Sequence, residues 1–136
     1  MLTPAAAPLR SVLIVDDQPM IQTVIRMMLE TLGVEICEAG TGAQAVQVCR
    51  DRRFDVVLMD MQMPGMDGLQ ATRAIRRLEA MVGRPPCRIV MLTGHADEDS
   101  RIRAAIAGAN QHLPKPIELD QLVKAVLARA ELKPCH

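Results

Sequence analysis

Three acidic residues stand where two apolar runs of the sequence end. Asp16 and Asp17 close the run SVLIVDD, and Asp60 closes the run FDVVLMD. Two unit charges about 4 Å apart repel by about 4 kcal/mol at an effective dielectric of 20, so converging carboxylates need a cation or a proton. Oxygen ligands without Cys or His favour Mg²⁺, with Mn²⁺ as an alternative ion. If the two runs are neighbouring strands, the three acids form a divalent-metal site.

Two further polar residues follow apolar runs and suit phosphate chemistry. Thr93 closes RIVMLT with a hydroxyl that can bond an anionic oxygen, and Lys115 follows QHLP with a mobile ammonium. The metal and Lys115 would neutralise a transferred phosphoryl group, and a carboxylate would be the nucleophile. These residue types therefore predict phosphoryl transfer.

The stretches between these residues alternate between short apolar runs and longer amphipathic segments. We expect strands at 11–16, 34–39, 54–60, 88–93 and 111–114, and helices at 18–33, 43–53, 69–82, 101–109 and about 117–130. Five strand–helix units in this order imply a parallel sheet covered by helices on both faces. Ligands of such sheets bind outside the carboxyl ends of the strands, which is where the five polar residues fall.

Length and composition predict one globular domain. The chain has 136 residues, of which 49% are hydrophobic and 24% are charged. The net charge of zero argues against a nucleic-acid surface. No apolar run approaches the roughly 20 residues that span a bilayer, and we find no signal peptide. We expect a domain over 11–130 with tails at 1–10 and 131–136.

The four cysteines predict no metal site and no disulfide framework. None of them shows CxxC or Cys/His ligand spacing; they are Cys37, Cys49, Cys87 and Cys135. Together with the absence of an export signal, this favours reduced thiols and a cytoplasmic location.

Four motifs resemble the response-regulator receiver family. They are DD at 16–17, DVVLMDMQMPGMDG at 55–68, MLTGHA at 91–96 and LPKP at 113–116. Their order and spacing make the resemblance specific, and it extends from about residue 11 to 130. It implies a CheY-like (βα)5 fold of the flavodoxin-like type: an α/β, doubly wound, five-stranded parallel sheet with strand order 2-1-3-4-5. That order places the first and third strands side by side.

The resemblance assigns roles to the acidic cluster. Asp60 resembles the aspartate that accepts a phosphoryl group. Asp17 resembles the direct Mg²⁺ ligand, and Asp16 the acid that acts on the ion largely through water. Gln62 would contribute its backbone carbonyl to the metal, so its side chain matters less for binding.

The resemblance also implies a switch at the other strand ends. Thr93 resembles the hydroxyl that moves to the phosphoryl group, and Lys115 resembles the lysine that binds phosphate. Lys115–Pro116 resembles a peptide bond that is usually cis. His112 stands where the family usually carries Tyr or Phe. It is either a smaller, titratable switch ring or an edge-strand histidine with no switching role.

The implied function is a phosphorylation switch without external substrate turnover. The donor would be a histidine kinase or histidine phosphotransfer protein, and autophosphatase activity would reset the switch. Partly exposed residues near the site would dock the donor; they are Met20, Ile21, Met63 and Met66. For Ile21 and Met66, core packing is the alternative reading. Output would go to a protein partner through about 98–130. We expect a single-domain regulator, with the receiver of a hybrid histidine kinase as the alternative.

Other functions fit less well. An aspartate-nucleophile phosphatase of the haloacid-dehalogenase type carries a second acid two residues after its nucleophile, where this chain has Gln62. A flavin-binding flavodoxin needs a Ser/Thr/Gly phosphate loop where this chain has Asp16-Asp17-Gln18-Pro19. A transition-metal site that includes His95 would lack a second nitrogen or sulfur ligand. A receiver that is never phosphorylated would not need all five core residues.

Overall fold

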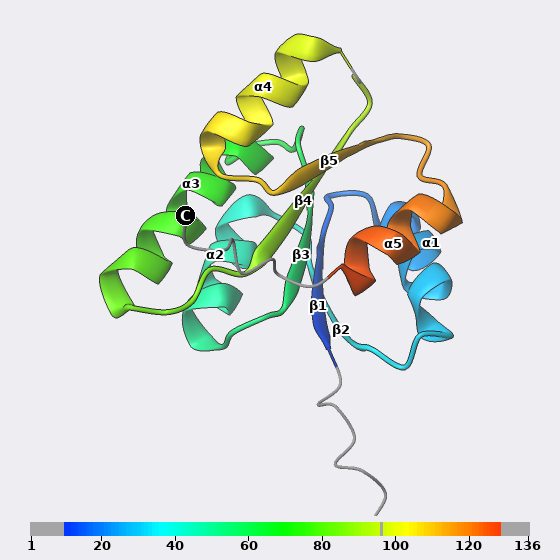
Figure 1. The fold of residues 1–136 in the computed structure, drawn as a ribbon, viewed down its shortest axis with the longest axis horizontal. Helices are drawn as coiled ribbons and strands as arrows, with labels where there is room; N and C mark the ends of the chain where they lie inside the picture. The colour runs from blue at the N-terminus through cyan, green and yellow to red at the C-terminus, as the bar shows by residue number, and fades with distance from the viewer. Residues whose placement is uncertain (1–9, 96, 129–136) are drawn as a thin grey trace, which may run out of the picture.

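Five parallel strands form one twisted sheet with helices on both faces (Figure 1). The computed structural model describes residues 10–95 and 97–128. The strands are β1 (Ser11–Val15), β2 (Glu35–Ala39), β3 (Val56–Asp60), β4 (Arg88–Thr93) and β5 (Gln111–Pro114). The helices are α1 (Pro19–Glu30), α2 (Gly42–Asp51), α3 (Gly68–Val82), α4 (Glu98–Ala107) and α5 (Leu119–Leu127). The order β2-β1-β3-β4-β5 confirms the predicted fold class and strand order.

The hydrophobic core lies in two layers, one on each face of the sheet. Side chains alternate across a strand, so Leu13 and Val15 of β1 face one layer while Val12 and Ile14 face the other. The first layer packs against α2, α3 and α4, and the second packs against α1 and α5 (Figure 1). Because the central strands are buried on both faces, their sequences are continuous apolar runs.

Several helix ends differ from the prediction, among them the start of α4 and the end of α1. We expected residues 94–100 to be loop, but α4 begins at Glu98 because the Asp97 carboxylate accepts a hydrogen bond from the Ser100 amide at 2.8 Å. At the other end of the chain, α1 was expected to extend to Gly33. It ends at Glu30, and Gly33 occupies the following turn with a φ of 68°.

Some predictions concern residues outside the described part of the chain. These are the tails, apart from Arg10, and the expected end of the last helix at 129–130, so the domain limits of 11–130 stay a prediction. Of the four cysteines, Cys37, Cys49 and Cys87 are free thiols, and Cys135 lies outside the described residues. No helix in the described ranges has the length and hydropathy needed to cross a membrane.

Candidate functional site

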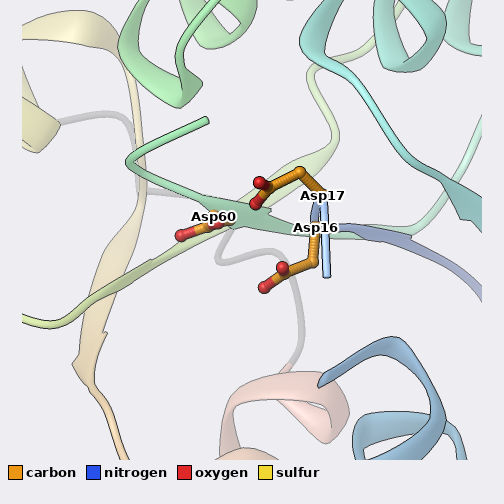
Figure 2. Close-up of side chains that lie close together, drawn as sticks. All are labelled: Asp16, Asp17 and Asp60. Carbon is orange, nitrogen blue, oxygen red and sulfur yellow. The ribbon is translucent and has the colours of Figure 1, made fainter. Parts of the chain in front are cut away.

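The parallel pairing of β1 with β3 brings the three acids together. Val15 pairs with Met59, so Asp16 and Asp17 follow β1 at the same edge where Asp60 ends β3. One carboxylate oxygen from each acid lies within 4.8 Å of the others. Figure 2 shows the three side chains at the ends of the two strands. The predicted convergence of Asp16, Asp17 and Asp60 is therefore present in the structure.

Charge and burial make this cluster suitable for a divalent cation. Asp16 and Asp60 are buried and Asp17 is exposed. The ammonium of Lys115 lies 2.9 Å from Asp60 Oδ1 and 3.4 Å from Asp16 Oδ2. Three carboxylates against one ammonium leave two negative charges when all are ionised. Hard oxygen ligands and a double negative charge match the requirements of Mg²⁺.

The local environment shifts the pKa of both partners in the central ion pair. Desolvation by burial raises the pKa of Asp60, against the lowering effect of its hydrogen bond with Lys115. The nearby Asp16 carboxylate raises it further. Desolvation lowers the pKa of Lys115, but the hydrogen bond and charge of Asp60 outweigh that effect and raise it above its ordinary value. The site therefore holds a charged lysine against an acid that is costly to ionise.

The turn after β5 places Lys115 at the site. The Lys115 amide donates to the Thr93 carbonyl at 2.7 Å, which extends the pairing of β5 with β4 by one residue. The Lys115–Pro116 peptide bond is cis, the isomer that the resemblance implies. Pro114 lies in an edge strand, where a residue without an N–H costs the sheet little.

The Thr93 hydroxyl is engaged away from the carboxylates. It donates to the His95 carbonyl at 3.1 Å and accepts from the His95 amide at 3.0 Å. Thr93 is 1% exposed, so the hydroxyl lies beneath the β4–α4 connection rather than in solvent. His95 itself is exposed and does not belong to the acidic cluster.

His112 is more enclosed than the reading as an exposed edge-strand residue required. The side chain is half-buried on β5, and Nε2 is buried without a hydrogen-bond partner among the described residues. A buried ring nitrogen without a hydrogen-bond partner is unfavourable. The described part of the structure therefore packs the His112 ring against its neighbours and does not use Nε2 as a hydrogen-bonding group.

The remaining predicted residues are divided between surface and core. Met20 is 76% exposed on α1, in agreement with a docking role, and Ile21 is half-buried. Met63 is 8% exposed and belongs to the core cluster, so the prediction that it is exposed near the site was wrong. Met66 is half-buried against the same cluster. The Gln62 side chain is exposed, and the Gln62 backbone N–H donates to Asp60 Oδ1 at 3.4 Å.

Sequence reasoning missed Gln22, a polar residue of α1 that contacts the backbone of the acidic loop. Its side-chain amide donates to the carbonyl of Asp16. The only signal in the sequence is its position five residues after Asp17, which is a weak one.

Comparison with known families assigns the chain to a class. The family described as the response regulator receiver domain matches residues 12–127. The chain therefore belongs to the response-regulator receiver family, as its four motifs predicted.

Relatives show that such domains occur within larger proteins. The chain is 42% identical over 116 residues to the sensor protein GacS of Pseudomonas syringae pv. syringae. This match covers 85% of the chain and 13% of GacS, so the chain spans only a small part of that relative.

Two solved structures extend the comparison. One is the receiver domain of sensor histidine kinase PA1611 from Pseudomonas aeruginosa PAO1, with magnesium coordinated in its active-site cleft. It has a TM-score of 0.77 and 36% identity over 87% of this chain and 94% of that one. The other is a co-crystal structure of the Saccharomyces cerevisiae phosphotransfer protein Ypd1 with the receiver domain of Ssk1. It has a TM-score of 0.83 and 28% identity over 88% of this chain and 87% of that one.

Proposed function

We propose that the chain is a Mg²⁺-dependent phosphoacceptor switch and that Asp60 receives the phosphoryl group. The observation that carries this proposal is the contact of Lys115 with Asp60 at 2.9 Å, inside a cluster that also holds Asp16 and Asp17. An isolated buried aspartate would have no reason to face two more acids and a lysine. A site for a cation and a phosphoryl group accounts for all four residues.

The proposed chemistry is a direct displacement at phosphorus. A carboxylate oxygen of Asp60 forms the new O–P bond while the bond between phosphorus and the donor, a phosphohistidine nitrogen or an acyl oxygen, breaks. The donor atom leaves with the electron pair of the broken bond. Lys115 neutralises charge on the phosphoryl oxygens. Asp16, Asp17, Asp60 and the Gln62 carbonyl would hold Mg²⁺, which supplies further charge neutralisation when bound.

The switch would follow from a new partner for the Thr93 hydroxyl. After phosphorylation, this hydroxyl leaves the His95 backbone and donates to a phosphoryl oxygen. The movement would pull on the β4–α4 connection and change the packing around His112 on β5. We propose that the surface formed by residues 98–128 carries this change to a protein partner.

The proposed phosphodonor is a histidine kinase or a histidine phosphotransfer protein. A face of α1 is suited to such a partner, since Met20, Val24 and Met27 follow one another at helical spacing and are 76%, 41% and 64% exposed. These side chains form an apolar stripe, and methionine adapts to varied partners. The Ssk1 receiver in complex with Ypd1 supports a donor of this chemical class.

Two contexts agree with this function. The first is a single-domain cytoplasmic regulator that acts through protein binding, with autophosphatase activity and no external substrate. The second is the receiver of a hybrid histidine kinase, which the similarity to part of the sensor protein GacS favours. The chemistry of the site is the same in both contexts.

The test is incubation with acetyl phosphate and Mg²⁺, followed by intact-mass measurement. We expect the wild-type protein to gain the mass of one phosphoryl group, Asp60→Asn to gain none, and EDTA to prevent the gain. Asp67→Asn is the matched control, because Asp67 is a nearby acid that caps α3 and Asn preserves a cap. Modification of Asp60→Asn, or none of wild type, would contradict the proposal. Enzyme-like turnover of unrelated phosphoesters would favour the phosphatase alternative.

A further inference from the structure

The side chain of Gln22 ties together the two strand ends that carry the acidic loop. Its Nε2 donates to the Asp16 carbonyl at 2.6 Å and to the Ala39 carbonyl at 3.1 Å. A primary amide has two N–H donors, so both are used on backbone groups. The Ala39 carbonyl also accepts from the Asp16 amide at 3.2 Å, which is the last link between β1 and β2. Gln22 therefore hydrogen-bonds the backbone where β1 and β2 end and the acidic loop begins.

Gln22 is also part of a small hydrogen-bond network at the start of α1. The Gln22 backbone N–H donates to the Gln18 carbonyl at 3.2 Å, and the Gln18 backbone N–H donates to Asp16 Oδ1 at 2.9 Å. Gln22, Gln18 and Asp16 thus fix one another through backbone and side-chain bonds. As a result, the carbonyl oxygen of the peptide that joins Asp16 to Asp17 is fixed by a hydrogen bond.

Asp17 depends on this backbone for its orientation. Its side chain is exposed, and within the described residues its carboxylate accepts no hydrogen bond from the protein. Asp16 is different, because its carboxylate is held by the Gln18 amide and by Lys115. The direction of the Asp17 carboxylate is therefore set by the Asp16–Asp17 peptide, whose carbonyl Gln22 holds.

We propose that Gln22 is a positioning residue for metal binding: it holds the Asp16–Asp17 peptide so that the Asp17 carboxylate faces Asp60. This inference rests on the proposed function, since it presumes a Mg²⁺ site at the acidic cluster. Gln22 does not touch the metal. It acts by lowering the cost of ordering Asp17 when the ion binds, as groups that orient metal ligands do elsewhere.

The test compares Gln22→Met with Gln44→Met. Methionine keeps the length of the glutamine side chain and removes its donors and acceptor. Gln44 is a matched control, because it also lies in the first turn of a helix and bonds a strand-end loop, accepting from the Gly40 amide at 2.7 Å. It does not contact the acidic loop. Mg²⁺ affinity is measured by calorimetry and by NMR shifts of the Asp17 amide, and unfolding in EDTA by circular dichroism.

We expect Gln22→Met to weaken Mg²⁺ binding about tenfold, the lower end of the usual effect for residues that orient metal ligands. Gln44→Met should lose stability to a similar extent with an unchanged Mg²⁺ dissociation constant. If Gln22→Met does not fold, Gln22→Asn serves instead, because its shorter amide cannot span both carbonyls. An affinity equal to wild type, or an equal loss in Gln44→Met, would overturn the inference alone. A wild-type protein that binds no Mg²⁺ would overturn the proposed function as well.

Discussion

The ammonium of Lys115 lies 2.9 Å from Oδ1 of Asp60, a residue 55 positions earlier in the chain. The side chain of Asp60 is 6% exposed and that of Lys115 is 25% exposed. An ionised carboxylate at this depth needs a cation or a strong donor beside it. The pair therefore controls both the cost of holding Asp60 ionised and the charge that an incoming phosphoryl group would meet.

Lys115→Met should slow phosphorylation by acetyl phosphate about a hundredfold, the usual effect of removing one group that stabilises transferred charge. Its Mg²⁺ affinity should not fall, because the ammonium repels a cation. Initial rates from intact mass at saturating Mg²⁺ measure the first effect, and calorimetry measures the second. Lys124→Met, which alters an exposed lysine of α5, is the control and should behave as wild type. Equal rates for Lys115→Met and Lys124→Met would contradict the role assigned to Lys115.

Asp60→Asn should stabilise the metal-free protein at pH 7. Burial raises the pKa of Asp60 in the folded state above the ordinary value of 3.8, so the folded state binds this proton more tightly than the unfolded state. Ionisation then costs stability above the folded pKa, and the cost disappears below the unfolded pKa. Asparagine removes the cost, with a gain of the order of 1 kcal/mol, a typical size for a single substitution.

Urea unfolding in EDTA, followed by circular dichroism across a pH series, tests this expectation. The difference between Asp60→Asn and wild type should shrink as the pH falls toward 4. Mg²⁺ should reduce the difference at pH 7, since the cation stabilises the ionised carboxylate. A constant difference across the series would exclude the titration of Asp60 as its cause.

Gly68→Ala should destabilise the protein strongly and disturb the backbone of the phosphoacceptor. A Cβ on Gly68 would lie 2.2 Å from the Asp60 carbonyl oxygen and 2.9 Å from Met61 Cα, and these backbone atoms cannot rotate away. We expect a loss of about 3 kcal/mol in the free energy of unfolding, at the upper end for overpacking. Gly94→Ala is the matched control, because no atom lies within 4 Å of its added Cβ. Similar stabilities for the two variants would show that the β3–α3 backbone yields more easily than this contact indicates.

His112→Phe should raise the free energy of unfolding. The buried Nε2 has no partner in the described structure, and phenylalanine keeps a ring while removing the unsatisfied atom. The expected gain is about 1 kcal/mol, the usual cost of one unsatisfied buried polar atom. His95→Phe at an exposed position should give no comparable gain. A less stable His112→Phe would mean that the nitrogen has an interaction that the structure lacks.

His112→Ala addresses the switch itself. We expect this variant to be phosphorylated as wild type but to bind its partner less tightly in the phosphorylated form, because no ring remains to follow Thr93. Partner binding measured with and without acetyl phosphate checks the expectation. Unchanged phosphorylation-dependent binding would favour the reading in which His112 has no switching role.

The order of the elements and the identity of the acidic cluster were determined by the sequence alone. Short apolar runs such as RIVMLT favour strands buried on both faces, and β4 matches that run from Arg88 to Thr93. Asp16, Asp17 and Asp60 could be expected to meet because parallel strands place their carboxyl ends at one edge. These features depend on local pattern and on the geometry common to all parallel sheets.

Only the tertiary structure decided where individual side chains point. No pattern in the sequence places the Thr93 hydroxyl on the His95 backbone, buries Met63, or turns Gln22 toward the Asp16 carbonyl. Each of these outcomes depends on which atoms of distant or adjoining segments fill the space around the residue. Type and spacing select the element in which a residue lies, whereas packing across elements selects its partner.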